Sequence, residues 1–259
     1  MKRMPWLSLV LAITLSACGG GGGGTPGPVP LTPEDISGLA TGSLTMGPGN
    51  PALPDGGTFN FEQFASGDRI LQRYPPSFSL MTESHFAIVE TVELADGRRM
   101  AKVMGTSRNY LSGQFVNVTE FEAEVIPGAT TSGAYTGETD EGTFESSHDN
   151  NTARGASFAE ANHTWGRFSS SYGPSLHIDI EGNITGHFLN CEINSGQITI
   201  PQDNVNVYAI DMTATCGGAT SSESFSGYFS ITGQPGSRTL KGMMNNNERA
   251  VPIDLYQQD

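Results

Sequence analysis

The feature that most constrains the fold is a period-two alternation of apolar and polar residues, which recurs from about Thr58 to Tyr256. Leu176, Ile178 and Ile180, for example, share one face of segment 175–180, and segments 225–231 and 251–255 follow the same pattern. Such alternation is typical of strands with one buried face, whereas an amphipathic helix repeats every 3.6 residues. The sequence therefore predicts an all-β protein without a long helix.

Turn signals separate these segments every 8–12 residues, the spacing of an antiparallel barrel or sandwich. Gly182-Asn183 predicts a hairpin turn, and Pro235-Gly236 suits a type II turn. Within 115–125 the apolar positions change face midway, which predicts a bulge. We expect a β domain at residues 58–259, with a possible sub-boundary near 127–131. One closed barrel and two sub-domains both remain open.

The first residues have the layout of a secretory signal peptide. Lys2 and Arg3 precede a short apolar run that ends at Leu15, and two small residues, Ser16 and Ala17, follow it. The run is about half of the roughly 20 apolar residues that cross a membrane. We therefore expect residues 1–17 to be a signal peptide rather than a membrane-spanning helix.

The segment Leu15-Ser16-Ala17-Cys18 resembles the lipobox of bacterial lipoproteins. The resemblance implies cleavage before Cys18, a diacylglycerol on its thiol and an acyl chain such as palmitate on its amine. Several chains are needed for stable anchoring in a membrane. Gly19 stands where an Asp would signal retention in the inner membrane, so the resemblance implies the outer membrane, on the periplasmic face or the cell surface. The alternative is an ordinary signal peptide with an incidental cysteine at the cleavage site.

Residues 18–57 predict a flexible tether between this anchor and the folded part. Six glycines follow Cys18, and the rest of the segment is rich in Pro and Gly without a sustained apolar period. Such composition buries too little apolar surface to offset the entropy of ordering. A flexible chain of this length spans roughly 30–40 Å, which would hold the β domain clear of the lipid.

The charge of the chain excludes some partners. Its formal net charge is −14, and loss of Lys2 and Arg3 with the signal peptide takes it to −16. An acidic protein repels phosphate groups, which argues against nucleic acid and against docking of a basic patch on anionic lipid. The expected contact with a membrane is therefore the N-terminal lipid alone.

Cys191 and Cys216 remain once Cys18 is lipidated. An even pair in an oxidising compartment predicts a disulfide, with two buried thiols as the alternative. If segments 184–190, 196–201 and 205–214 form a meander, the two cysteines lie on strands one apart. We then expect the bond to cross the start of the middle strand, where the chain curls past the end of the sheet.

The C-terminal third resembles a set of β-rich proteobacterial lipoproteins of unassigned function, although Asn190 stands where they usually have Gly. The resemblance implies a compact antiparallel fold and no known activity. A looser architectural similarity links the chain to the calycin-like barrel lobes of surface lipoproteins that bind host proteins or haem. The pattern shared with the β-rich proteobacterial lipoproteins consists of Gly182, Ile184, Gly186, Cys191, Gly196, Asn206, Tyr208 and Cys216.

Two groups of residues are weak candidates for a site. His177, Asp179 and Glu181 share a strand face and could ligate a metal, although a solvated sheet face explains them as well. His163 and Trp165 could contact a ligand, although such a Trp more often closes the end of a β core. We find no nucleophile elbow, Walker loop or zinc-protease motif, and the sequence implies no cofactor.

These patterns favour a non-enzymatic binding module for a protein or small-molecule ligand, because a strand scaffold with variable loops is sufficient for that role. An envelope hydrolase that uses acidic residues is one alternative. An envelope-structural protein without a ligand is another.

Overall fold

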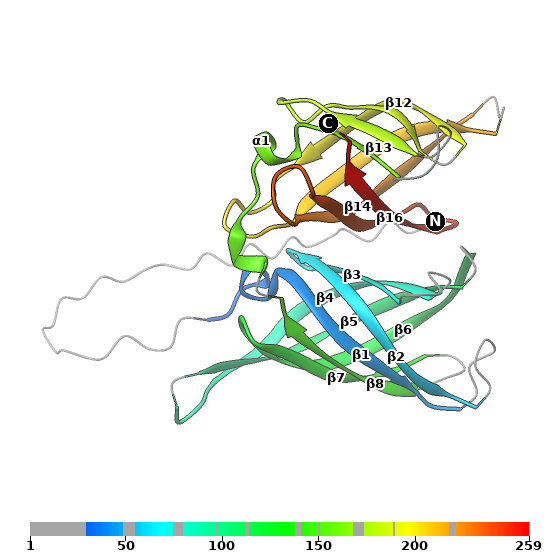
Figure 1. The fold of residues 1–259 in the computed structure, drawn as a ribbon. Helices are drawn as coiled ribbons and strands as arrows, with labels where there is room; N and C mark the ends of the chain where they lie inside the picture. Colours follow the sequence, from blue (N-terminus) through cyan, green and yellow to red (C-terminus); the bar gives the residue numbers. More distant parts are fainter. Residues whose placement is uncertain are drawn as a thin grey trace, which may run out of the picture.

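The computed structural model describes residues 30–48, 55–74, 80–96, 98–111, 114–137, 141–149, 151–167, 174–188, 190–217 and 221–258. The expected signal peptide, Cys18 and the glycine run lie outside these residues. The described part forms two closed antiparallel barrels of eight strands each (Figure 1). The prediction of an all-β, barrel-like fold is confirmed.

The N-terminal barrel is an up-and-down barrel in which β1 pairs with both β2 and β8. A short 3₁₀ helix, η1 (Pro33–Ile36), precedes it. Its strands are β1 (Gly38–Met46), β2 (Gly57–Ser66), β3 (Arg69–Arg73), β4 (Leu80–Glu93), β5 (Arg99–Leu111), β6 (Gln114–Ile126), β7 (Thr130–Thr136) and β8 (Glu141–His148).

The C-terminal barrel closes by pairing β9 with both β10 and β16. The segment that joins the barrels holds η2 (Thr152–Arg154) and the single turn α1 (Phe158–Ala161). The strands are β9 (Thr164–Gly166), β10 (Ser175–Ile178), β11 (Ile184–Phe188), β12 (Cys191–Thr199), β13 (Tyr208–Cys216), β14 (Ser222–Thr232), β15 (Thr239–Asn245) and β16 (Ala250–Gln257).

The predicted domain boundaries are wrong in two places. Residues 38–46, expected in the tether, form β1, because Leu44 and Met46 pack into the core of the N-terminal barrel. The expected sub-boundary near 127–131 is the hairpin turn between β6 and β7. The barrels divide instead between β8 and β9, where the joining segment runs along one side of the molecule (Figure 1).

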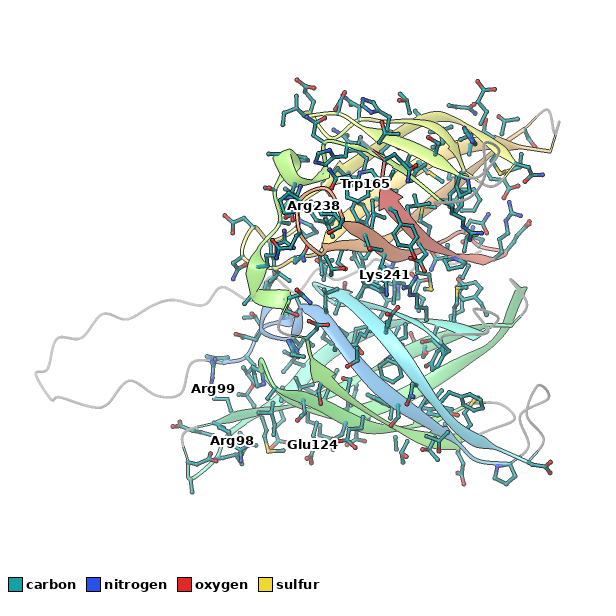
Figure 2. All side chains as sticks on the ribbon, in the orientation of Figure 1. Arg98, Arg99, Glu124, Trp165, Arg238 and Lys241 are labelled. Carbon is teal, nitrogen blue, oxygen red and sulfur yellow. A yellow bond between two sulfur atoms is a disulfide. The ribbon has the colours of Figure 1, made fainter. Side chains whose placement is uncertain are left out.

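The interior of the C-terminal barrel is filled by apolar side chains. Tyr208 and Phe229 stack with ring centroids 4.9 Å apart, and the Tyr208 hydroxyl donates to the carbonyl of Ser157. Burial raises the pKa of Tyr208 to about 12. Trp165 closes one end of this core and is fully buried (Figure 2).

The disulfide between Cys191 and Cys216 is confirmed, but its expected geometry is wrong. Cys191 begins β12 itself, and Cys216 ends the neighbouring strand β13. The two residues are direct cross-strand partners, so the bond crosses no middle strand. The expected meander is present as β11–β12–β13, but its middle strand begins at Cys191 rather than at residue 196, so the two cysteines lie on adjacent strands.

The barrels pack side by side through apolar residues of β1–β5 on one side and of β14–β16 and the loop before β13 on the other. Tyr228 contacts both apolar clusters at this interface. Lys241, which lies between the barrels in Figure 2, forms an ion pair with Glu62 across the interface. The buried residues of these clusters are Leu39, Phe64, Leu71, Met81, Tyr110, Val205, Val207, Met243 and Ala250.

Candidate functional site: the cleft between the barrels

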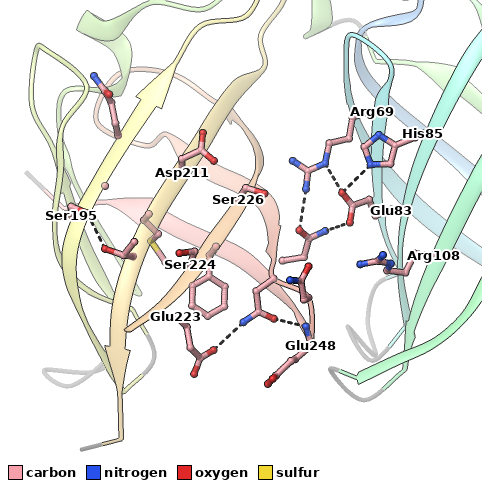
Figure 3. A pocket seen from close by; sticks show the side chains of 18 of the residues that line it. Arg69, Glu83, His85, Arg108, Ser195, Asp211, Glu223, Ser224, Ser226 and Glu248 are labelled. Atoms are coloured by element: carbon pink, nitrogen blue, oxygen red, sulfur yellow. Dashed lines mark hydrogen bonds and ion pairs between the residues drawn. The ribbon is translucent and has the colours of Figure 1, made fainter. Parts of the chain in front are cut away.

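A cleft of about 1380 Å³ opens where the outer faces of the two barrels diverge (Figure 3). His85, Thr106 and Arg108 line the wall formed by β4 and β5. The opposite wall is formed by β12, β13 and β14, and Asp211 and Ser224 lie on it. Side chains alternate across a strand, so these outward positions leave the barrel interiors intact.

The floor of the cleft is a polar network that joins the barrels. Arg69 Nε donates to Glu83 Oε1 at 2.7 Å, and Arg69 Nη2 donates to Asn245 Oδ1 at 3.0 Å. Asn245 Nδ2 in turn donates to Glu83 Oε2 at 2.7 Å, and His85 Nε2 lies 3.4 Å from Glu83 Oε1. The Arg69 guanidinium also lies over the ring of Tyr228, 5.3 Å from its centroid. These contacts fix the angle between the two walls.

A second network shapes the rim on the C-terminal barrel. Glu223 accepts hydrogen bonds from Arg249 and from the Asn246 amide, both at 2.9 Å. Asn246 Oδ1 accepts from the backbone N–H of Glu248 and of Arg249, which fixes the turn between β15 and β16. The Arg249 guanidinium lies over Phe225, 5.5 Å from the ring centroid.

Hydroxyl and amide groups cover the wall of the C-terminal barrel beside this rim. Ser195 and Thr213 are hydrogen-bonded across β12 and β13 at 2.9 Å. Asn194 Nδ2 donates to Thr215 Oγ1 at 2.9 Å and to Ser222 Oγ at 2.6 Å. This wall is therefore rich in hydrogen-bonding groups and carries the carboxylate of Asp211, whereas Arg108 and His85 face it from the other barrel.

The wall of the N-terminal barrel continues along β4 and β5 as an apolar surface. Val89, Val92 and Met104 are 54%, 47% and 49% exposed, and only Ile180 joins them among the exposed large hydrophobic residues of the described chain. A bulge between Ile88 and Glu90 inserts Val89 as an extra residue that points outward. A concentration of exposed apolar side chains on one hairpin is typical of a protein-binding surface.

Charged side chains of both signs border this apolar surface. The pKa of Lys102 is raised, chiefly by its contact with Glu122 and further by Glu90 and Glu124 nearby.

The structure does not gather the candidate metal ligands into a site. His177 is exposed on β10, with Nδ1 3.3 Å from Thr164 Oγ1. Asp179 accepts hydrogen bonds from the side chain and backbone of Asn183 and from the backbone of Glu181, which lowers its pKa and closes the β10–β11 turn. Within the described ranges no three His, Cys, Asp or Glu side chains come together as a metal site.

His163 and Trp165 also lie away from the cleft. Trp165 Nε1 donates to the carbonyl of Ala161 at 2.9 Å inside the core, and the His163 ring meets the indole edge-on at 6.0 Å. His163 Nε2 lies 3.3 Å from the Arg238 guanidinium. The structure therefore places Trp165 in the core of the C-terminal barrel. This agrees with the alternative interpretation, in which the indole closes the end of the core and does not contact a ligand.

Residues of the pattern shared with the β-rich proteobacterial lipoproteins also have structural roles in the C-terminal barrel. Buried Asn206 donates to the carbonyl of Ile231 and accepts from its N–H, which ties the loop before β13 to β14. Gly186 adopts a φ of 116°, and a Cβ there would lie 2.2 Å from the carbonyl oxygen of Ser175. These residues therefore specify the barrel, although Gly196 of the same pattern also lines the cleft.

No protein-family model matches the chain, and no curated protein or solved structure matches it significantly. Among the described residues, no helix combines the length and the apolar character that a membrane crossing requires. What the cleft does must follow from its own residues.

Proposed function

We propose that the protein is a lipid-anchored lipoprotein of the outer membrane that binds a partner protein, without catalysis, in the cleft between its barrels. The cleft itself is the observation that carries this proposal. Its walls are strands of two closed barrels, and the Arg69–Glu83–Asn245 network holds them at a fixed angle. Such preorganisation lowers the entropic cost of binding.

The size and lining of the cleft favour a protein over a small molecule. Small-molecule pockets enclose about 300–1,000 Å³ and are mostly apolar, whereas this cleft is larger, open and lined by charged, hydroxyl and amide groups. The apolar surface with Val89 and Met104 extends one wall. A protruding loop of a partner could contact both walls and this surface together.

The barrels restrict how the partner is recognised. Every strand of the described barrels pairs on both sides, so no strand edge is open to an added strand. Recognition would therefore depend on side chains, with Arg108 and His85 on one wall and hydroxyl groups on the other.

Two carboxylates of the cleft are engaged in structural contacts, which disfavours the hydrolase alternative. Glu83 is bonded to Arg69 and Asn245, and Glu223 is bonded to Arg249 and Asn246. A general acid or base must instead reach the substrate.

The anchor rests on the lipobox-like sequence at Cys18. Pro30, the first described residue, follows Cys18 by 12 positions, and a chain of that length spans at most about 40 Å in any conformation. The proposed anchor would therefore keep the barrels within about 40 Å of the lipid. Metabolic labelling with palmitate tests it: label should enter the native chain and be lost in Cys18→Ser. Equal labelling of the two chains would refute the anchor.

A photo-crosslinking amino acid tests the cleft in intact cells. It is introduced at Thr106 or Ser224, which face each other across the cleft, and in matched chains at the exposed positions Thr143 and Gln234 outside it. We expect one discrete adduct of the same partner from both cleft positions and no such adduct from the control positions. Adducts of equal yield from all four positions, or from none, would contradict a partner in the cleft.

A further inference from the structure

The interior of the N-terminal barrel differs from that of the C-terminal barrel in carrying a belt of polar side chains. Adjacent strands place these residues opposite one another: Gln63 faces Gln72, Gln72 faces Thr82, and Ser84 faces Ser107. A buried polar group is costly unless it finds a hydrogen-bond partner. The belt consists of Gln63, Gln72, Thr82, Ser84, Ser107 and Thr131.

Part of the belt is satisfied internally. Gln72 Nε2 donates to Gln63 Oε1 at 3.0 Å, and Gln72 Oε1 accepts from Thr82 Oγ1 at 2.9 Å and from Tyr74 at 3.2 Å. Four other groups have no hydrogen-bond partner among the described residues. They are Gln63 Nε2, Ser84 Oγ, Ser107 Oγ and Thr131 Oγ1.

These four residues line an internal cavity of about 50 Å³. This exceeds the volume of about 10–15 Å³ that a polar cavity needs to hold a water molecule, so the cavity has room for water. Gln63, Ser84 and Thr131 are each at least nine-tenths buried, so the cavity and not bulk solvent must satisfy them, whereas Ser107, also nine-tenths buried, borders both this cavity and the cleft.

Towards η1 the cavity lining becomes apolar. Ile70, Val103 and Val125 line this part, and Ile36 of η1 reaches in and closes it. The closing segment lies outside the strand ladders. Its contacts to the barrel include an ion pair between Asp35 and Arg99 at 3.8 Å and a hydrogen bond from Leu31 N–H to Thr91 at 3.4 Å. Displacing η1 would therefore open the cavity without breaking a strand pair.

We propose that the N-terminal barrel is a second binding site, which takes an uncharged amphipathic molecule. Its hydroxyl or amide end replaces water against Gln63, Ser84, Ser107 and Thr131. Its apolar part occupies the volume of Ile36, which moves aside with η1. Eight-stranded barrels have an interior of the size that holds one small ligand.

The chemistry of the lining selects against a charged ligand. Among its described residues the cavity has no Asp, Glu, Lys, Arg or His, and its titratable side chains are Tyr74 and Tyr135. Burial raises the pKa of Tyr74, so its hydroxyl stays neutral. A carboxylate or ammonium group would lose its hydration here without gaining a counter-charge.

Isothermal calorimetry at pH 8 tests the proposal. The full protein, kept in solution by an anionic amphipol, is titrated with hexan-1-ol and, separately, with hexanoate. We expect saturable binding of one hexan-1-ol per chain and at least tenfold weaker binding of hexanoate. Ser107→Leu, which fills the cavity, should abolish binding. Ser84→Ala removes one hydrogen bond and should weaken binding about five- to tenfold. Ile36→Ala should tighten it, because less side chain has to be displaced.

Met212→Leu in the core of the C-terminal barrel is the matched control and should leave the affinity unchanged. Equal binding of hexanol and hexanoate, or no saturable heat of binding, would overturn the proposal. If Ser107→Leu does not fold, Ser84→Ala decides: an affinity equal to that of the native chain overturns the site.

Discussion

Arg73 is a buried charge that joins the two barrels. Its side chain is 1% exposed and forms an ion pair with Glu62 on the neighbouring strand. Nη1 donates to the carbonyl of Ile253 at 2.9 Å and more weakly to that of Gly242 at 3.4 Å, both in the other barrel. A buried cation is tolerated only when such partners compensate its lost hydration.

The first prediction is that Arg73→Met lowers the free energy of unfolding by about 3 kcal/mol, because buried carbonyls lose their donor and Glu62 loses its main cation. Arg98→Met is the control, since Arg98 pairs with Asp96 in full exposure and should change stability by less than about 0.5 kcal/mol. Urea unfolding measures both. Equal effects of the two substitutions would contradict the role given to Arg73.

The second prediction concerns His148, because burial lowers the pKa of its imidazole below the usual value near 6.5. The unfolded chain then binds a proton that the folded chain resists, so stability is lost as pH falls through about 6.5 towards the folded pKa. In His148→Gln the loss of unfolding free energy between pH 7 and pH 5.5 should be smaller than in the native chain. Urea unfolding at both pH values measures it, and an unchanged difference would count against the mechanism.

At the scale of elements, the β12–β13 hairpin depends on its disulfide. The third prediction is that Cys191→Ala/Cys216→Ala lowers the unfolding free energy by about 3 kcal/mol, because the bond closes a loop of 25 residues in the unfolded chain. The control Ser195→Ala/Thr213→Ala removes an exposed cross-strand pair of the same hairpin and should cost less than about 1 kcal/mol. Indistinguishable losses in urea unfolding would contradict the prediction.

Alternation predicted the C-terminal strands well, because each has one face in a filled core. Leu176 and Ile178 of β10 are fully buried, as expected, but Ile180, expected on the same face, lies beyond the end of β10 and is 50% exposed. Segment 115–125 does contain a bulge, but not midway as expected: a register shift against Asn109 and Tyr110 leaves Val116 as an extra residue, and β6 pairs without interruption from Asn117 to Val125.

The same reasoning failed where the apolar signal was sparse or a bulge was hidden. β1 is rich in Gly, Ser and Thr, and its partners rather than its composition make it a strand. On β4, Phe86 is buried but Val92, six positions later, is exposed, because the bulge at Val89 reverses the alternation between them. The cleft was not predictable either, because Arg69, Glu83 and Asn245 meet only when two barrels pack together.

At the scale of the whole molecule, the barrels are joined by more than the segment between β8 and β9. Tyr228 packs against apolar residues of both interface clusters, its hydroxyl donates to the carbonyl of Ser66 at 3.3 Å, and its ring lies beneath Arg69. Burial raises the pKa of Tyr228, as expected for a phenol enclosed between the barrels. An interface with apolar clusters and cross-barrel hydrogen bonds should couple the stability of the two halves.

The fourth prediction follows from that coupling. We expect calorimetry to record one unfolding transition for the native chain and a transition that splits into two for Tyr228→Ala, because loss of the ring removes the contact that both interface clusters share and weakens the coupling of the barrels. Ile180→Ala, which trims an exposed side chain outside the interface, should keep the single transition. Two transitions already in the native chain would mean that the barrels are independent, and a cleft of fixed angle could not then depend on their interface.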